Sequence, residues 1–247
     1  MKLKHMNKVI LRFQLFLILT GFFILISAGL PAQDTVLNKY GLWVISDVAQ
    51  LQKMASINHA KAMVDLKKTI PGLQMDLRYA GTNNFMHQKL YQPTKTTYLR
   101  KSAADSLVTI QKELNEKGLG LKVFDAYRPY AVTEKLWEPV KDDRYAADPK
   151  KGSGHNRGIA VDLTLIQLTT MEELDMGTGF DNFSDTAHHS FLALPSPVLQ
   201  NRLLLRSVME KHGFKALESE WWHYYLPNTT AYELLNIEFN KLKKINK

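Results

Sequence analysis

The chain has 247 residues, of which 45% are hydrophobic and 23% are charged, with a formal net charge of +8 at pH 7 and no cysteine. This length suits one sizeable domain, and the composition excludes the disordered and fibrous classes of protein. Because cysteine is absent, disulfide bonds and lipid attachment through a thiol are excluded as well. We therefore expect one globular domain that is stable through its hydrophobic core alone.

The first 32 residues are typical of a targeting segment. Four basic residues precede an apolar run at 15–26, and small residues follow up to Ala32. The run is shorter than the roughly 20 residues that cross a bilayer, which favours a cleaved signal peptide over a permanent anchor. We predict a signal peptide at 1–32, an N-terminal extension at 33–60 and a catalytic domain at 61–247. The protein would then be exported to the periplasm, or tethered to the inner membrane if the leader is uncleaved.

The positive charge is concentrated near the two ends of the chain. The leader holds four basic residues and no acidic residue, and the last seven residues hold four lysines. No basic stripe interleaved with aromatic residues occurs between them. We therefore expect no nucleic-acid partner, and no stable membrane span once the leader is removed.

Hydrophobic periodicity and turn residues predict an α+β fold with a central, mainly antiparallel sheet flanked by helices. The expected elements, in chain order, are a loose amphipathic helix within 42–54, a strand at 73–79, a helix from a capping box at Ser102 and Asp105 to Gly118, a strand at 121–126, a helix at 130–138 that stops before Pro139, a strand at 158–166, a helix at 196–212, a hairpin of strands at 214–217 and 220–226, and a terminal helix at 231–244. Polar loops fill 141–152 and 168–195.

A histidine and an aspartate flank the predicted strand at 158–166. His155 lies seven residues before Asp162, an odd spacing that would put the two on opposite faces of one uninterrupted strand. Gly158 lies between them and allows a loop to fold back, so that both side chains could reach one metal ion. The alternative is a hydrogen-bonded surface histidine and an aspartate in a turn.

A second cluster lies in the aromatic run Glu220-Trp221-Trp222-His223-Tyr224-Tyr225. A carboxyl group in such water-poor surroundings is expected to have a raised pKa and to act as a base near neutral pH. Catalytic zinc sites commonly use three protein ligands and keep a fourth position for water. Two histidines and one aspartate from the two segments would complete such a set and leave Glu220 as the base. The alternative for this aromatic run is a core strand without a metal site. A metal site would require a bend or bulge in the strand between Glu220 and His223.

Together these segments resemble the zinc signature of the D-alanyl-D-alanine dipeptidases of the VanX type, a family of zinc peptidases. The resemblance covers about residues 73–226. Besides Ser153 to Asp162 and Glu220 to His223, it includes Tyr79-Ala80, Asn84-Phe85, Asp125-Ala126-Tyr127-Arg128-Pro129, Met176-Gly177-Thr178, Phe180-Asp181, His188-His189 and Asn201-Arg202.

The resemblance implies a fold of the Hedgehog/DD-peptidase type and a role for each matching residue. It implies one Zn²⁺ per chain bound by His155, Asp162 and His223, with Glu220 as the general base. Arg128 would stabilise the oxyanion, although a surface ion pair with Asp125 is the alternative for that arginine.

Other matching positions imply contacts with a small dipeptide. Tyr79, Ser153 and Asp181 would hold the two ends of the substrate, with Asp181 on the free ammonium group. His188 and His189 would shape the pocket without binding metal. The implied reaction is hydrolysis of D-alanyl-D-alanine to two D-alanines in peptidoglycan metabolism. The alternatives are a peptidoglycan D,D- or L,D-carboxypeptidase or endopeptidase, and a non-catalytic zinc-binding wall module.

Overall fold

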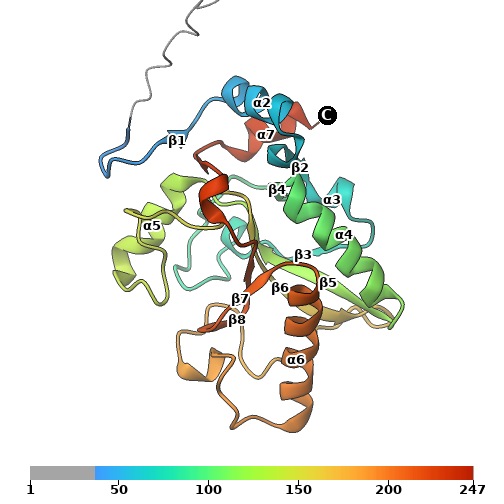
Figure 1. Cartoon of the computed structure of the whole chain (residues 1–247). Helices are drawn as coiled ribbons and strands as arrows, with labels where there is room; N and C mark the ends of the chain where they lie inside the picture. Colours follow the sequence, from blue (N-terminus) through green and yellow to red (C-terminus); the bar gives the residue numbers. More distant parts are fainter. Residues whose placement is uncertain (1–36, 247) are drawn as a thin grey trace, which may run out of the picture. The chain divides into compact units, whose positions relative to one another are not determined.

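The computed structural model describes residues 37–246, which fold into layers of helices around a mixed sheet (Figure 1). The expected α+β class is confirmed. The predicted signal peptide at 1–32 lies outside the described residues. Among residues 37–246, no helix is both long and apolar enough to cross a membrane.

The central sheet has five strands in the order β3-β5-β6-β8-β7. Its strands are β3 (Gln74–Met75), β5 (Leu119–Asp125), β6 (Ala160–Gln167), β7 (Lys215–Leu217) and β8 (Glu220–Tyr225). Strand β3 runs parallel to β5, whereas the pairs β5/β6, β6/β8 and β7/β8 are antiparallel. The sheet is therefore mixed, with its single parallel pair at one edge.

Two long helices, α4 (Lys101–Asn115) and α6 (Ser196–Lys211), cover one face of this sheet (Figure 1). Their apolar side chains share one core with the odd-numbered residues of β6, which include Val161, Leu163 and Leu165. Successive strand residues point to opposite faces, so Asp162 points away from that core. The helix α5 (Tyr130–Val140) lies on the other side of the sheet in the view of Figure 1.

The residues near both described ends pack together beside this sheet. Strand β1 (Val44–Ile45) pairs in parallel with β9 (Leu234–Leu235), and β2 (Met63–Asp65) pairs with β4 (Tyr98–Arg100) in the antiparallel sense. The helices of this layer are α2 (Val48–Ile57), α3 (Leu66–Thr69) and α7 (Phe239–Ile245). Short 3₁₀ turns lie at 59–61, 78–80, 185–187 and 229–231.

A fully buried arginine connects this layer to the middle of the chain. Arg100 donates hydrogen bonds from its guanidinium to the carbonyl oxygens of Lys61 at 2.6 Å, Arg157 at 2.9 Å and Glu233 at 3.2 Å. Because each N–H of a buried cation needs an acceptor, these carbonyls stabilise the arginine and hold three distant segments together.

Two predictions about the first half of the domain are wrong at the level of local structure. The strand predicted at 73–79 is limited to Gln74–Met75, and Tyr79 lies in a 3₁₀ turn. The capping box at Ser102 and Asp105 does not form, because helix α4 begins at Lys101 and Ser102 lies inside its first turn, where its hydroxyl hydrogen-bonds with the hydroxyl of Tyr232 at 2.8 Å.

Two helix boundaries also differ from the prediction. Helix α5 continues through Pro139 to Val140, because a proline in the last turn removes only one hydrogen bond of the helix. The terminal helix predicted at 231–244 begins only at Phe239, since the preceding residues form a 3₁₀ turn and strand β9. Pairing of β9 with β1 keeps these residues extended.

The expectation that His188 and His189 shape the pocket is wrong, because neither lines the cavity described below. The ring of His189 packs edge-on against Tyr224, with 6.1 Å between the ring centroids. Its Nε2 atom is buried and has no hydrogen-bond partner among the described residues. Burial lowers the pKa of His189 to about 4, so this imidazole is neutral in the folded protein.

Acidification is therefore expected to destabilise the fold through His189. In the unfolded chain His189 binds a proton below its ordinary pKa of 6.5, whereas in the folded chain it binds one only near pH 4. The free energy of unfolding therefore decreases as the pH falls from 6.5 to about 4. Between pH 7 and pH 5 we expect the free energy of unfolding of His189→Phe to fall by about 1 to 2 kcal/mol less than that of wild type. Urea denaturation of both proteins at the two pH values measures this. Parallel losses in both proteins would contradict the assignment.

Candidate active site

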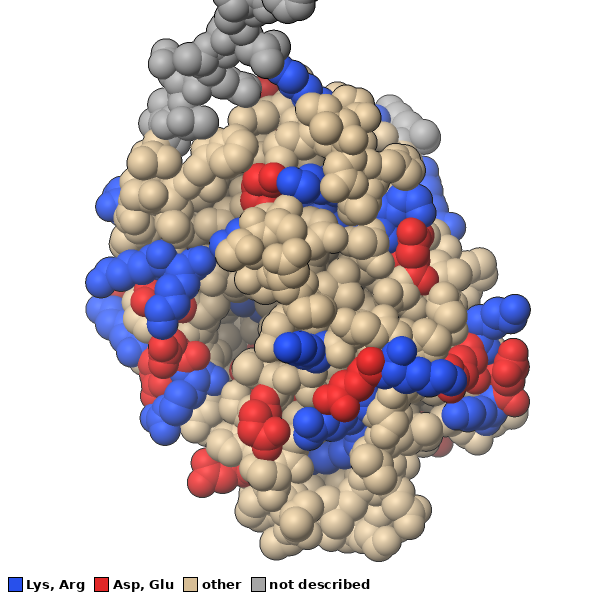
Figure 2. All heavy atoms as spheres, viewed as in Figure 1, with Lys and Arg blue, Asp and Glu red and all other residues tan. Residues whose placement is uncertain are grey.

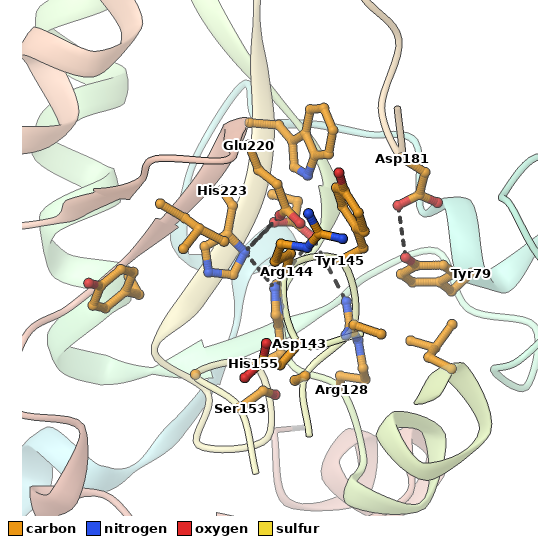
Figure 3. A pocket seen from close by; sticks show the side chains of 18 of the residues that line it. Tyr79, Arg128, Asp143, Arg144, Tyr145, Ser153, His155, Asp181, Glu220 and His223 are labelled. Atoms are coloured by element: carbon orange, nitrogen blue, oxygen red, sulfur yellow. Dashed lines mark hydrogen bonds and ion pairs between the residues drawn. The ribbon is translucent and has the colours of Figure 1, made fainter. Parts of the chain in front are cut away.

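A cavity of about 270 Å³ opens on the sheet face that carries Asp162 (Figure 3). The structure brings all eight of the predicted site residues to its wall, namely Tyr79, Arg128, Ser153, His155, Asp162, Asp181, Glu220 and His223. Binding sites for drug-sized ligands commonly measure about 300–1,000 Å³, so this cavity suits a small molecule.

Three side chains in this cavity form a ligand set for a metal ion. The Nδ1 atom of His223 lies 2.9 Å from Oδ1 of Asp162 and 3.2 Å from Nε2 of His155, and that Nε2 atom lies 3.4 Å from Oδ2 of Asp162. Ligand atoms about 2.0–2.1 Å from a tetrahedral zinc ion would be about 3.4 Å apart. Two imidazole nitrogens and a carboxylate at this spacing fit a divalent metal ion such as zinc.

The loop before β6 positions His155 for this role. Gly158 has a φ of 69°, and its N–H donates to the carbonyl oxygen of His155 at 3.0 Å, so the chain folds back before the strand begins. The Nδ1 atom of His155 lies 2.6 Å from the carbonyl oxygen of Ala126. A carbonyl accepts only from a protonated nitrogen, which leaves Nε2 free to bind a metal. The loop predicted from Gly158 is therefore present.

An irregularity in β8 brings Glu220 and His223 to the same cavity. His223 pairs with Asp162 of β6, while on the other side the register with β7 shifts between Ala216 and Leu217. A bulge of this kind breaks the strict alternation of side chains. The bend that the spacing of Glu220 and His223 required is therefore present, and an oxygen of Glu220 lies 3.8 Å from Nδ1 of His223.

Burial sets the protonation behaviour of these groups. Burial raises the pKa of Glu220 to about 8, although the neighbouring His223 lowers it in part. Burial also disfavours the charge of Asp162, but His155 and His223 hold the pKa of that carboxyl well below its usual range. The site therefore contains one carboxylate suited to bind a cation and one carboxyl able to exchange a proton near neutral pH.

Arg128 lines the cavity and is ion-paired with Asp125, but this pair is buried and not at the surface as the alternative required. Its Nε and Nη2 atoms donate to Oδ2 of Asp125 at 3.0 and 2.9 Å, and Asp125 is fully buried. The hydroxyl of Tyr91 donates to the other oxygen of Asp125 at 2.8 Å. Burial alone would lower the pKa of Arg128, but Asp125 outweighs it and raises that pKa, so the guanidinium stays charged in a fixed orientation.

Asp181 lies beside Tyr79 in the cavity wall, across the view of Figure 3 from His223. The Tyr79 hydroxyl donates to Oδ1 of Asp181 at 3.0 Å, and the Phe85 N–H donates to Oδ2 at 3.5 Å. Burial raises the pKa of Asp181 to about 7. An incoming ammonium group would therefore stabilise the charged form of this carboxyl.

The hydroxyl of Ser153 is held at the cavity wall by Asn156, whose N–H donates to Oγ of Ser153 at 3.1 Å. The side chain of Asn156 also donates to the carbonyl oxygen of Arg128 at 2.9 Å. Asn156 therefore connects the serine loop to the arginine turn. As an acceptor from Asn156, the hydroxyl keeps its own proton available for a ligand.

Sequence reasoning missed the part of the wall that comes from the loop at 141–152. Asp143, Arg144 and Tyr145 of this loop line the cavity, as does Phe85 from another loop. The polar composition of 141–152 was the only signal, and it indicated a loop without indicating which side chains would face the cavity. Figure 2 shows charged side chains of both signs around a hollow in the surface near the middle of that view.

Comparisons with known proteins agree with this geometry. The sequence model of the D-ala-D-ala dipeptidase family matches residues 59–244. The D-alanyl-D-alanine dipeptidase of Escherichia coli is 37% identical over 178 residues, which are 72% of this chain and 91% of that protein. The dipeptidase of the same name from Streptomyces coelicolor is 33% identical, covering 67% and 90%, and that from Enterococcus faecium is 32% identical, covering 65% and 89%. The chain therefore belongs to the D-ala-D-ala dipeptidase family of metallopeptidases.

Proposed function

We propose that this protein hydrolyses the D-alanyl-D-alanine dipeptide to two D-alanines and thereby takes part in peptidoglycan metabolism. The observation that carries the proposal is the meeting of a metal-ligand triad, a buried glutamate and a second buried carboxyl in one small cavity of a member of the dipeptidase family. For the fold we propose the Hedgehog/DD-peptidase type, because the chain belongs to the dipeptidase family and most strand pairs of its central sheet are antiparallel.

We assign zinc to the triad of His155, Asp162 and His223, one ion per chain. The donor set and the spacing of its atoms fit this ion. Bound zinc would polarise the carbonyl group of the substrate and would lower the pKa of a bound water molecule to about 7.

The side chains around the triad then have distinct tasks. Glu220 accepts a proton from the attacking water and passes it to the nitrogen of the leaving amine, a sequence that requires a carboxyl with a pKa near neutrality. Arg128, fixed by Asp125, directs its remaining N–H groups toward the scissile carbonyl oxygen as this oxygen gains negative charge.

Asp181 and Ser153 hold the two ends of the substrate. Asp181, oriented by Tyr79, pairs with the free ammonium group of the dipeptide. Ser153 donates its hydroxyl proton to the other end. A requirement for a free amine this close to the scissile bond excludes longer peptides, since a buried Asp181 would be left without a cation.

Replacement of Arg128 by lysine is expected to lower kcat by about 10²- to 10³-fold, the usual loss of one oxyanion-stabilising donor. An ammonium group cannot bind Asp125 and a carbonyl oxygen with the same fork of N–H groups. Steady-state kinetics with D-alanyl-D-alanine should show this loss in kcat more than in KM. A change confined to KM would contradict the oxyanion role.

We place the enzyme outside the cytoplasm, in the periplasm, because of the basic and apolar leader at 1–32. An exported enzyme would encounter dipeptide released from the cell wall. Fractionation of expressing cells, with N-terminal sequencing of the protein recovered, tests the location and the cleavage. Recovery of the uncleaved protein in the cytoplasm would contradict it.

The substrate assignment is tested by incubating the purified protein and zinc with free D-alanyl-D-alanine and with a muropeptide that ends in the same two residues. We expect release of D-alanine from the free dipeptide only. Cleavage of the muropeptide alone would instead identify a peptidoglycan carboxypeptidase. Inactivity on both substrates in a protein with bound zinc would point to a binding module.

A further inference from the structure

The carboxylate end of the dipeptide has so far only an uncharged partner, the hydroxyl of Ser153, and no cation of the cavity wall is assigned to it. Its wall includes four carboxyl groups, those of Asp143, Asp162, Asp181 and Glu220, and two guanidinium groups, those of Arg128 and Arg144. A dipeptide carries a carboxylate as well as an ammonium group. Zinc at the triad would act on the scissile carbonyl group, so a carboxylate at the end of the substrate needs a cation of its own for binding to be favourable.

Arg128 is not available for that carboxylate. Two of its nitrogen atoms donate to Asp125, and its side chain is only 9% exposed. Its Nη2 atom also lies 3.9 Å from Asp162, beside the metal ligands. The N–H groups that remain therefore face the scissile bond rather than the far end of the substrate.

Arg144 is the other guanidinium of the wall, and it is exposed, with its guanidinium 5.2 Å from the centroid of the Tyr145 ring. Its side chain is 70% exposed and pairs with Asp142, to which Nε and Nη2 donate at 3.0 and 2.6 Å. An exposed ion pair of this kind contributes little, about 0–1 kcal/mol, so its replacement by another carboxylate has a small cost. In Figure 3 the side chain lies between Glu220 and Asp181 as seen in that view.

The loop that carries Arg144 is held in place by its neighbours. The ring of Tyr145 stacks on that of Phe183 with 5.1 Å between the ring centroids, and Phe183 in turn contacts the edge of Phe85 at 5.0 Å. The Ser219 hydroxyl donates to the carbonyl oxygen of Arg144 at 3.5 Å. The backbone is therefore fixed at the mouth of the cavity, while the guanidinium at the end of its flexible stem can turn inward.

We propose that Arg144 determines specificity by binding the free carboxylate of the dipeptide, leaving Asp142 as the substrate enters. The two carboxylates are equivalent partners for the planar fork of the guanidinium, and Ser153 can donate to the same substrate group. This inference rests on the proposed dipeptidase function and adds to it a requirement for a negatively charged C-terminal end.

The test removes the two charges separately, one from the enzyme and one from the substrate. Wild type and Arg144→Gln are assayed with D-alanyl-D-alanine and with D-alanyl-D-alaninamide, in which the carboxylate is blocked. We expect Arg144→Gln to lower kcat/KM for the free acid by about 10- to 100-fold, mainly through KM, and to lower that for the amide much less. Arg144→Lys should recover part of the loss, because it keeps the charge without the fork.

Two further variants serve as controls on the same loop. Lys141→Gln removes one positive charge from an exposed side chain that does not line the cavity, and it should leave the preference for the free acid unchanged. Asp142→Asn releases Arg144 and should lower KM for the free acid.

The outcomes separate this inference from the function on which it rests. An equal loss for acid and amide in Arg144→Gln, in an enzyme that hydrolyses D-alanyl-D-alanine, would show that Arg144 is merely structural and would overturn the inference alone. If wild type hydrolyses neither compound, the proposed function fails and the role of Arg144 fails with it.

Discussion

Glu220→Gln is expected to lower kcat by about 10²- to 10⁴-fold, the usual contribution of a general acid–base group. Glutamine keeps the size and the polarity of the side chain but can neither accept nor deliver a proton. The metal should remain bound, because the triad of His155, Asp162 and His223 is complete without Glu220. Parallel measurements of kcat and of zinc content therefore separate the loss of the base from the loss of the metal.

The neighbourhood of Glu220 provides a matched control. Glu218 lies in the same hairpin but is exposed and does not line the cavity, so Glu218→Gln should leave kcat unchanged. Full activity in Glu220→Gln would assign the proton transfer to another group. Loss of zinc together with activity would instead indicate that Glu220 supports the metal site.

Asp162→Ala is expected to release the metal and to lower kcat/KM by at least about 10³-fold, because metal-ion catalysis supplies several kcal/mol of transition-state stabilisation. Only two neutral imidazoles would remain for a dication, and the negative charge that both histidines contact would be lost. Wild type stripped with a chelator should lose activity to the same extent and recover it when zinc is added.

The comparison between these two proteins is the decisive measurement. The activity of Asp162→Ala should not recover at the zinc concentration that restores the activity of stripped wild type. The variant would have a lower affinity for zinc, which the same concentration does not overcome. Retention of stoichiometric zinc by Asp162→Ala would contradict its assignment as a ligand. Activity of the stripped wild type, verified to be free of metal, would contradict metal dependence itself.

The sequence predicted the site better than the elements around it. Ligand residues are chemically distinctive, and the alternating apolar residues of β6 fixed which face Asp162 occupies. The bends at Gly158 and in β8 could be inferred because two separated side chains had to reach one metal.

What could not be predicted depends on contacts between distant residues. The Ser102 capping box is a strong local signal, yet helix α4 follows directly on strand β4 and begins at Lys101, and the Ser102 hydroxyl hydrogen-bonds with Tyr232, which is far along the chain. The residues before Phe239 are compatible with a helix until β1 pairs with β9. The place of the loop that carries Arg144 depends likewise on the stacking of Tyr145 on Phe183, which belongs to another loop. None of these contacts is encoded in the spacing of nearby residues.

The pairing of Val44 in β1 with Leu234 in β9 has a consequence for the order of folding. Contacts between residues so far apart in the chain form slowly, because a long loop must close before any stabilisation is gained. Arg100 shares this property, since one of its carbonyl partners belongs to Glu233, near the end of the chain. We therefore expect this layer to assemble after the central sheet, whose neighbouring strands and helices form a core of their own.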